Sequence, residues 1–79
     1  MRTTKAITRA CLVVGGQAEL ARAVGVSPGA VNQWCKGIRA VPAERCPLVE
    51  RATRGLVRCE EMRPDIAWSV LRQASQQAA

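Results

Sequence analysis

The stretch Gln17-Ala-Glu-Leu-Ala-Arg-Ala-Val-Gly-Val-Ser-Pro-Gly-Ala-Val-Asn-Gln-Trp-Cys-Lys36 decides how this chain folds. It contains two short helical patterns on either side of Gly25, where the chain must reverse and glycine adopts a positive φ without strain. Ser27 followed by Pro28 is a strong helix start, and Gly37 is a strong helix stop. We therefore expect two short helices joined by a tight turn.

Small and apolar residues lie where two such helices would pack. Ala21 is at the expected crossing point, where a small side chain allows close approach. Apolar side chains that would face the rest of the protein follow at Val24, Val26, Val31 and Trp34. The combination predicts a DNA-binding helix-turn-helix, and an ordinary helical hairpin is the alternative.

The second helix of this pair has a distinct outer face. At 100° per residue, one side gathers Ser27 with the apolar positions, and the other side gathers small residues, two amides and a cation. Amide side chains can hydrogen-bond adenine edges, and small residues allow close approach to a duplex. The alternative is a solvated polar face. The outward residues are Pro28, Gly29, Asn32, Gln33 and Lys36.

Phosphate contacts are expected around this face. Gln17 begins the first helix, Ser27 caps the second, and Arg39 follows its end. Lys36 lies near the helix end and could reach a base or a phosphate. Weaker candidates, equally consistent with solvated charges, are Lys5, Arg9 and Arg22.

The remaining sequence also predicts helices. Apolar spacings of three and four predict helices at about 4–14, after Val41-Pro42, at about 59–63 and over 66–74. The fold class is all-α, with five helices in a helix-turn-helix domain at 1–65 and a C-terminal helical extension at 66–79 whose end frays. Leu48 beside one stripe and Trp68 opposite the stripe of Ile66, Val70 and Leu71 are expected to leave apolar surface for self-association, and the equally weighted alternative is that both pack within one chain.

Charge and composition narrow the function. The chain has 12 basic and 6 acidic residues, so its net charge is +6. The excess is concentrated in residues 1–39, and a net charge this high suggests a polyanionic partner or an acidic protein. The absence of Phe and Tyr argues against RNA-type stacking platforms. No apolar run reaches membrane-spanning length, and no secretory signal is evident, so we expect a cytoplasmic protein.

The four cysteines do not indicate a metal site, because none forms a C-x-x-C pair. Cys11, Cys35, Cys46 and Cys59 each fall on or beside an apolar position, so we expect reduced thiols that pack as small hydrophobic side chains. There is no histidine, and no nucleophile is placed beside a base. We therefore expect no enzymatic activity, cofactor or metal.

Several blocks resemble a known family. The stretch at 15–27, the Val-Pro-Ala-Glu-Arg-Cys block at 41–46, and the blocks at 49–53 and 59–65 are similar to the Cro-like repressors of lambdoid prophages, closest to the YdaS-type antitoxin branch. The resemblance implies a lambda-repressor-like helical fold and a dimer that binds operator DNA with its third helix in the major groove. By position it assigns base-facing roles to Ser27, Pro28, Gly29, Asn32, Gln33 and Lys36, and a phosphate contact to Gln17.

The sequence departs from this branch at two positions. Arg58 stands where Ser or Thr is usual, which puts the cap of the short helix at about 59–63 in doubt, and Arg54 replaces a frequent glycine. Some Cro relatives form a β-hairpin in their C-terminal half. The apolar spacing of three and four over 43–53 favours the helical form here.

The expected function is sequence-specific repression through double-stranded operator DNA. A homodimer that is weak without DNA is the expected form, in the bacterial cytoplasm and associated with the nucleoid. The alternative is an antitoxin that neutralises a protein toxin and autoregulates its operon. The basic first half favours DNA as the main partner.

Overall fold

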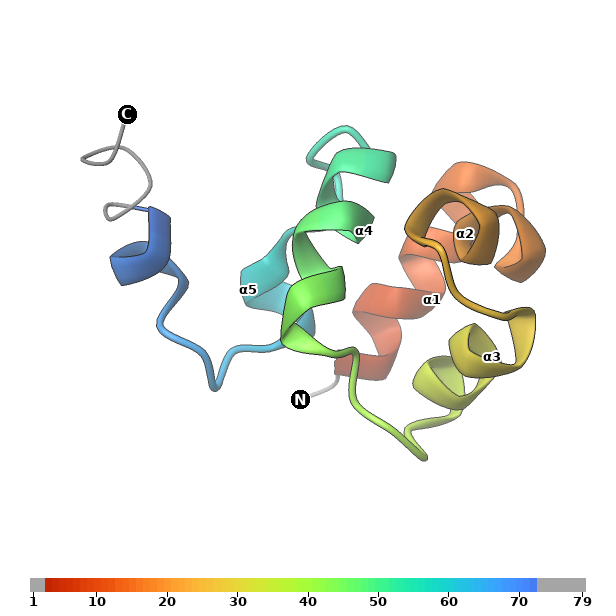
Figure 1. Cartoon of the computed structure of the whole chain (residues 1–79), viewed down its shortest axis with the longest axis horizontal. Coiled ribbons are helices and arrows are strands. Elements are labelled where there is room, and N and C mark those ends of the chain that lie inside the picture. Colours follow the sequence, from red (N-terminus) through yellow and green to blue (C-terminus); the bar gives the residue numbers. More distant parts are fainter. Residues whose placement is uncertain (1–2, 73–79) are drawn as a thin grey trace.

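The computed structural model describes residues 3–72, which form helices and no β-strand. The prediction of an all-α fold with five α-helices is confirmed, and a further helical turn covers residues 68–72. In Figure 1, α1, α2 and α3 gather at one end of the molecule, α4 lies in the middle, and the C-terminal turn lies at the opposite end. The elements in order are α1 (Thr3–Val14), α2 (Gln17–Val24), α3 (Pro28–Lys36), the 3-10 turn η1 (Ala43–Arg45), α4 (Cys46–Ala52) and α5 (Cys59–Met62).

The core forms where the first four α-helices each bury one apolar face. The predicted stripes of α1, α2 and α3 face this core, and each fully buried Val- or Leu-sized side chain contributes roughly 1.5–3 kcal/mol to its stability. Leu12 and Val13 lie outside the α1 stripe and are exposed. The buried residues include Ile7, Ala10, Cys11, Leu20, Ala21, Val24, Val31, Trp34, Cys46 and Val49.

The chain enters α4 through η1. The Pro42 carbonyl accepts hydrogen bonds from the N–H groups of Arg45 and Cys46, at 2.9 and 3.3 Å. This turn starts the helix, so Pro47 is the second residue of α4, where its missing N–H needs no intrahelical partner. Pro47 is therefore compatible with the helix.

Thr53 organises the connection from α4 to α5. Its side chain is buried, and its hydroxyl donates to the Glu50 carbonyl at 3.0 Å and accepts the Val57 N–H at 3.1 Å. Arg54 and Gly55 follow with φ of +56° and +82°. The left-handed conformation of Arg54 explains why glycine is frequent there among the relatives that the sequence resembles.

The start of α5 is capped without help from the side chain of Arg58. A carboxylate oxygen of Glu61 accepts the Arg58 N–H at 2.9 Å, and a carboxylate oxygen of Glu50 accepts the Cys59 N–H at 2.9 Å. Two otherwise unpaired N–H groups therefore have partners. Arg58 is compatible with the helix because Glu61 within α5 and Glu50 of α4 supply the cap.

The outward position expected for Trp68 and the inward position expected for Val70 and Leu71 were wrong. Trp68 is buried, and its indole N–H donates to the Arg63 carbonyl at 2.8 Å, while Val70 and Leu71 are exposed. The helical turn starts only at Trp68, so Ile66 does not share a helical wheel with the residues after it. Leu48 also packs partly against the core. Ala74 and the expected fraying of the tail lie outside the described residues.

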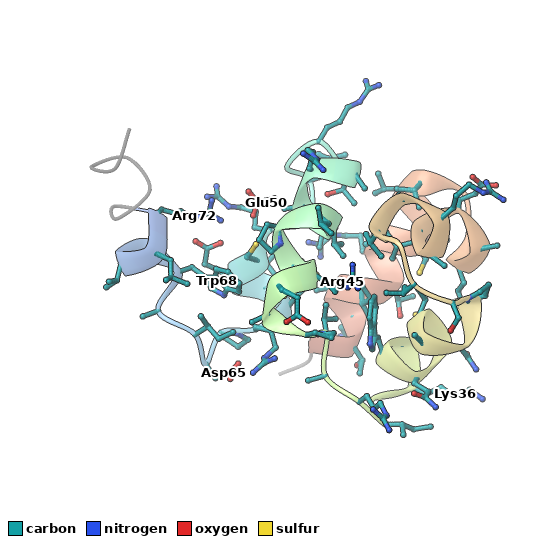
Figure 2. All side chains as sticks on the ribbon, viewed as in Figure 1. Lys36, Arg45, Glu50, Asp65, Trp68 and Arg72 are labelled. Carbon is teal, nitrogen blue, oxygen red and sulfur yellow. The ribbon has the colours of Figure 1, made fainter. Side chains whose placement is uncertain are left out.

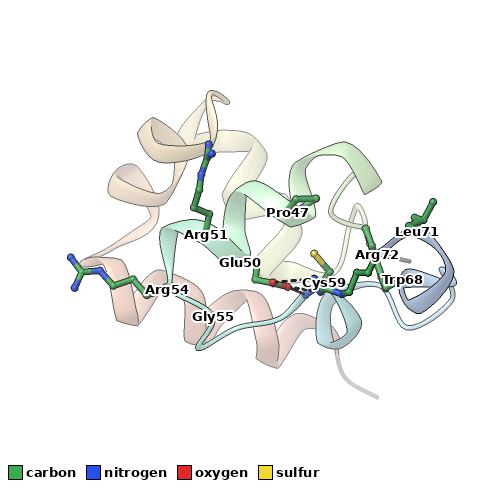
Figure 3. Close-up of a pocket in the computed structure, with 9 residues that line it drawn as sticks. All are labelled: Pro47, Glu50, Arg51, Arg54, Gly55, Cys59, Trp68, Leu71 and Arg72. Atoms are coloured by element: carbon green, nitrogen blue, oxygen red, sulfur yellow. Dashed lines mark hydrogen bonds and ion pairs between the residues drawn. The ribbon is translucent and has the colours of Figure 1, made fainter. Parts of the chain in front are cut away.

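Arginine–carboxylate contacts hold the C-terminal turn in place. The Arg72 guanidinium donates to Glu50 at 2.9 Å (Figure 3) and to Glu60 at 3.0 Å, which joins the turn to α4 and α5. Arg63 pairs with Asp65 at 2.8 Å and also donates to the Val41 carbonyl at 2.9 Å. The acids of the second half are therefore used mainly inside the molecule.

Three of the four cysteines are buried, in agreement with their predicted role as small hydrophobic side chains. Cys35 is half-buried, and its sulfur lies 3.7 Å from that of Cys11. Burial raises the pKa of the Cys11 thiol to about 12, which keeps it protonated at neutral pH. Over residues 3–72, no helix is long and apolar enough to cross a bilayer, and no group of three potential ligand side chains could hold a metal ion.

Candidate nucleic-acid interface

The turn between α2 and α3 is built on Gly25. This residue has a φ of +75°, and its N–H donates to the Ala21 carbonyl, as does the N–H of Val26 at 3.0 Å. The left-handed conformation ends α2 and redirects the chain. The tight turn predicted from the sequence is confirmed, and Ala21 is buried at the helix pair, where little room is available.

The ends of α3 are fixed by local hydrogen bonds. The Ser27 hydroxyl accepts the Ala30 N–H at 3.2 Å, and Pro28 is the first helical residue. Gly37 ends the helix with a φ of +77°, and the Ile38 N–H bonds to the Gln33 carbonyl at 3.0 Å. The predicted capping role of Ser27 is confirmed, so its hydroxyl is engaged within the protein.

The two faces of α3 differ in burial as predicted. Val31 and Trp34 are buried, with 0% and 4% of their surface exposed. Exposed residues occur at both ends of the opposite face, namely Pro28, Gly29 and Lys36. Asn32 and Gln33 are half-buried, so their stems are supported by neighbouring groups and their conformational freedom is reduced.

Two of the predicted phosphate ligands, Gln17 and Arg39, are exposed. Gln17 is the exposed first residue of α2, at the positive end of the helix dipole. Arg39 is exposed after the end of α3. Gln33 and Arg39 line the same hollow of about 510 Å³ between α3 and η1. The structure thus brings a candidate base-reading amide and a candidate phosphate ligand together.

Cations around α3 differ in whether they are already paired. Within residues 3–72, neither Lys36 nor Arg39 forms an ion pair, and Lys36 extends from the end of α3 (Figure 2). Arg22 pairs with Glu19 at 2.7 Å. Arg9 is likewise engaged, at 2.6 Å from Glu61. The weaker phosphate candidates at positions 9 and 22 therefore already have acidic partners.

One residue beside the interface was missed in the sequence analysis. Arg45 donates from its guanidinium to the carbonyl of Val24 at 3.0 Å, and Val24 is the last residue of α2. The Pro-Ala-Glu-Arg-Cys block contains this arginine, so the signal was present. Its partner is 21 residues earlier in the chain, which no local pattern reveals.

Comparisons with known proteins agree with this architecture. A family model described as "Bacterial toxin YdaS" matches residues 7–71. A protein of Escherichia coli (strain K12), described as a candidate transcriptional regulator and named YdaS, is 66% identical over 67 residues, which cover 85% of this chain and 68% of that protein.

A solved structure, that of the Cro protein from the candidate prophage element Xfaso 1 in Xylella fastidiosa strain Ann-1, superposes with a TM-score of 0.72. It is 43% identical and covers 77% of this chain and 92% of its own. The fold is therefore Cro-like, as the sequence resemblance implied. Since the family model spans most of the chain, this protein belongs to the YdaS family.

Proposed function

We propose that this protein is a transcriptional repressor that binds operator DNA as a homodimer, with α3 in the major groove. The observation that carries the proposal is the outer face of α3, which has small residues at its capped start, two half-buried amides in its middle, and Lys36 at its end with Arg39 just after it, neither of which forms an ion pair within residues 3–72. A helix with these properties suits both the shape and the chemistry of the major groove. The relatives described as a regulator and as a Cro protein support it.

In this proposal, base reading and phosphate binding are divided along the chain. Asn32 and Gln33 read base edges, since an amide can bond both N6 and N7 of adenine. Pro28 and Gly29 permit close approach of the helix start. Gln17, Ser27 and Arg39 face the phosphate backbone, with Ser27 contributing through its vicinity to the helix N-terminus because its hydroxyl is the cap. Lys36 can serve either purpose.

We expect a dimer because a single helix-turn-helix is small. One helix-turn-helix contacts only a few base pairs, so useful specificity requires two copies roughly 34 Å apart, one helical turn of DNA. Trp68 is buried within the monomer and no longer qualifies as the contact surface, whereas Leu48 is half-buried and keeps part of its surface available. Leu56, Val70 and Leu71 are exposed apolar residues of the C-terminal half that remain available.

The test compares one base contact with one phosphate contact, after the operator has been selected from random DNA. Gln33→Ala is expected to reduce discrimination at one position per half-site by roughly 1–3 kcal/mol and to leave the salt dependence nearly unchanged. Arg39→Ala is expected to weaken binding to all sequences alike and to lower the salt slope by about one unit per monomer.

The matched control is Arg51→Ala, an exposed cation of α4, which is expected to bind like the wild type. Affinities for operator and non-operator DNA are measured at several salt concentrations. Equal losses on both DNAs for Gln33→Ala would contradict the proposed position of α3. A selection that yields no preferred sequence would contradict specific binding altogether.

A second candidate function is that of an antitoxin that binds a protein toxin. An exposed hollow of about 480 Å³ favours it, because its lining combines apolar groups of Pro47, Trp68 and Leu71 with the side chain of Arg51 (Figure 3). Co-purification with the product of an adjacent gene tests this function. Loss of that complex in Leu71→Ser, with operator binding retained, would support it.

A further inference from the structure

Arg45 forms a hydrogen bond that crosses between two parts of the fold. It is the last residue of η1, immediately before α4, and its side chain is half-buried. Its Nη1 donates to the Val24 carbonyl at 3.0 Å. Figure 2 shows Arg45 between the start of α4 and the α2–α3 pair. The bond therefore connects the helix-turn-helix turn to the element that follows it.

The acceptor of this bond is at a helix end, where carbonyl groups lack partners. The chain leaves α2 after Val24, where the N–H groups of Gly25 and Val26 both bond back to the Ala21 carbonyl. The carbonyl of Val24 therefore lies at the helix end and is open to a donor from another part of the fold. A positive charge at a helix C-terminus is also favoured by the helix dipole. The guanidinium lies only 3.6 Å from where a side chain on Gly25 would begin, so it rests directly against the turn.

The turn held by Arg45 determines where α3 begins. Only Val26 and Ser27 separate Gly25 from the first residue of α3. A small rotation of this turn displaces the side chains that face bases, and recognition requires positions held to within about 0.5 Å. A residue that fixes the turn therefore influences base reading without contacting DNA.

We propose that Arg45 is a positioning residue for sequence recognition, which holds the α2–α3 turn against α4 and so sets the orientation of α3. This inference rests on the proposed DNA-binding function. A competing role is phosphate binding, because Arg45 also lines the hollow shared by Gln33 and Arg39. The two roles differ in their salt dependence, since a positioning residue releases no counterion when DNA binds.

The experiment uses the full chain with Arg45→Met, which keeps an unbranched apolar stem and removes the donor. Operator affinity is expected to fall about tenfold, the size of one lost charge-assisted hydrogen bond. Non-operator affinity should stay within about twofold and the salt slope should not change, because no phosphate contact is lost. Arg45→Lys, which retains a donor and the charge, is expected to recover part of the discrimination.

Arg51→Met serves as the control, since Arg51 is an exposed arginine of α4 and should leave the ratio of the two affinities unchanged. Circular dichroism at the assay temperature shows whether each variant is folded, and Arg45→Lys decides the matter if Arg45→Met is not. Equal losses on both DNAs, or a salt slope lowered by about one unit, would overturn the inference. If the wild type itself fails to discriminate, the proposed function fails instead.

Discussion

The helix-turn-helix region and the C-terminal region of this protein use their charged residues in different ways. In α2 and α3, stability comes from buried apolar side chains and helix caps, and Lys36 and nearby Arg39 form no ion pair within residues 3–72. In α5 and the turn after it, carboxylates bond to arginines at nearly every step. Among residues 3–72, three arginines of the second half, Arg58, Arg63 and Arg72, are paired with acids of the same half, whereas Lys36 and Arg39 of the first half have no acidic partner.

The two tryptophans offer the largest test of this contrast. Trp34 packs in the core beside α1 and α2, so Trp34→Ala should destabilise the fold by about 3–5 kcal/mol. Trp68 anchors only the C-terminal helical turn at the periphery. Because this turn can detach while the rest stays folded, Trp68→Ala should lower the free energy of unfolding by only roughly 2 kcal/mol. Urea unfolding followed by circular dichroism measures both values.

Leu12→Ala is the control for these substitutions. Leu12 is 78% exposed, so this change should alter stability by no more than about 0.5 kcal/mol. If Trp68→Ala proved as destabilising as Trp34→Ala, the two regions would be one cooperative unit.

Lowering the pH should destabilise the C-terminal region before the helix-turn-helix region, an effect smaller than that of the tryptophan substitutions. Hydrogen bonds from Arg72 lower the pKa of Glu60, and those from Arg63 lower the pKa of Asp65. Burial alone would raise the pKa of Glu50, but its bonds to Arg72 and to the Cys59 N–H outweigh burial and lower it. Because these groups bind protons less readily when folded, stability is present above their unfolded values and is lost as pH falls through the folded ones.

Hydrogen exchange between pH 6 and pH 3 is the measurement for this prediction. Amides of residues 59–72 should lose protection at a higher pH than those of α2 and α3, which hold fewer carboxylates. Glu60→Gln should reduce the pH dependence, since it removes one titrating partner of Arg72. Simultaneous loss of protection in both regions would refute the contrast.

The smallest expected effect is at Arg54, in the connection between α4 and α5. Its φ of +56° is costly for any residue with a side chain, so Arg54→Gly should stabilise the protein by up to about 1 kcal/mol, less the added freedom of the unfolded chain. Arg51→Gly, within α4, should destabilise it by about 1 kcal/mol. Thermal unfolding of both variants provides the comparison, and a loss of stability in Arg54→Gly would argue against the strain.

Local signals predicted most of the helices. Gly25, Ser27 and Gly37 act through their own backbone or their immediate neighbours, so the turn and both ends of α3 followed from the sequence. Val31 and Trp34 are the apolar positions on one side of α3, so their burial could be predicted from spacing alone. These features depend on neighbours within a few positions, which is the range that sequence patterns describe.

The features that escaped prediction depend on distant partners. Trp68 was placed outward because the spacing from Ile66 suggested one continuous helix, whereas the helical turn begins only at Trp68 itself. The bonds from Arg45 to Val24 and from Arg72 to Glu50 span 21 and 22 residues. Such contacts arise from the packing of whole elements, which spacing along the chain does not reveal.

The burial of both indoles has a spectroscopic consequence. The chain has two tryptophans and no tyrosine or phenylalanine, so all of its intrinsic fluorescence comes from Trp34 and Trp68. One indole lies in α3 and the other in the C-terminal turn, and both are shielded from water. In Trp34→Phe or Trp68→Phe, the emission of the remaining tryptophan reports on one end of the molecule alone. A red shift of that emission shows that the indole at that end has become exposed to water.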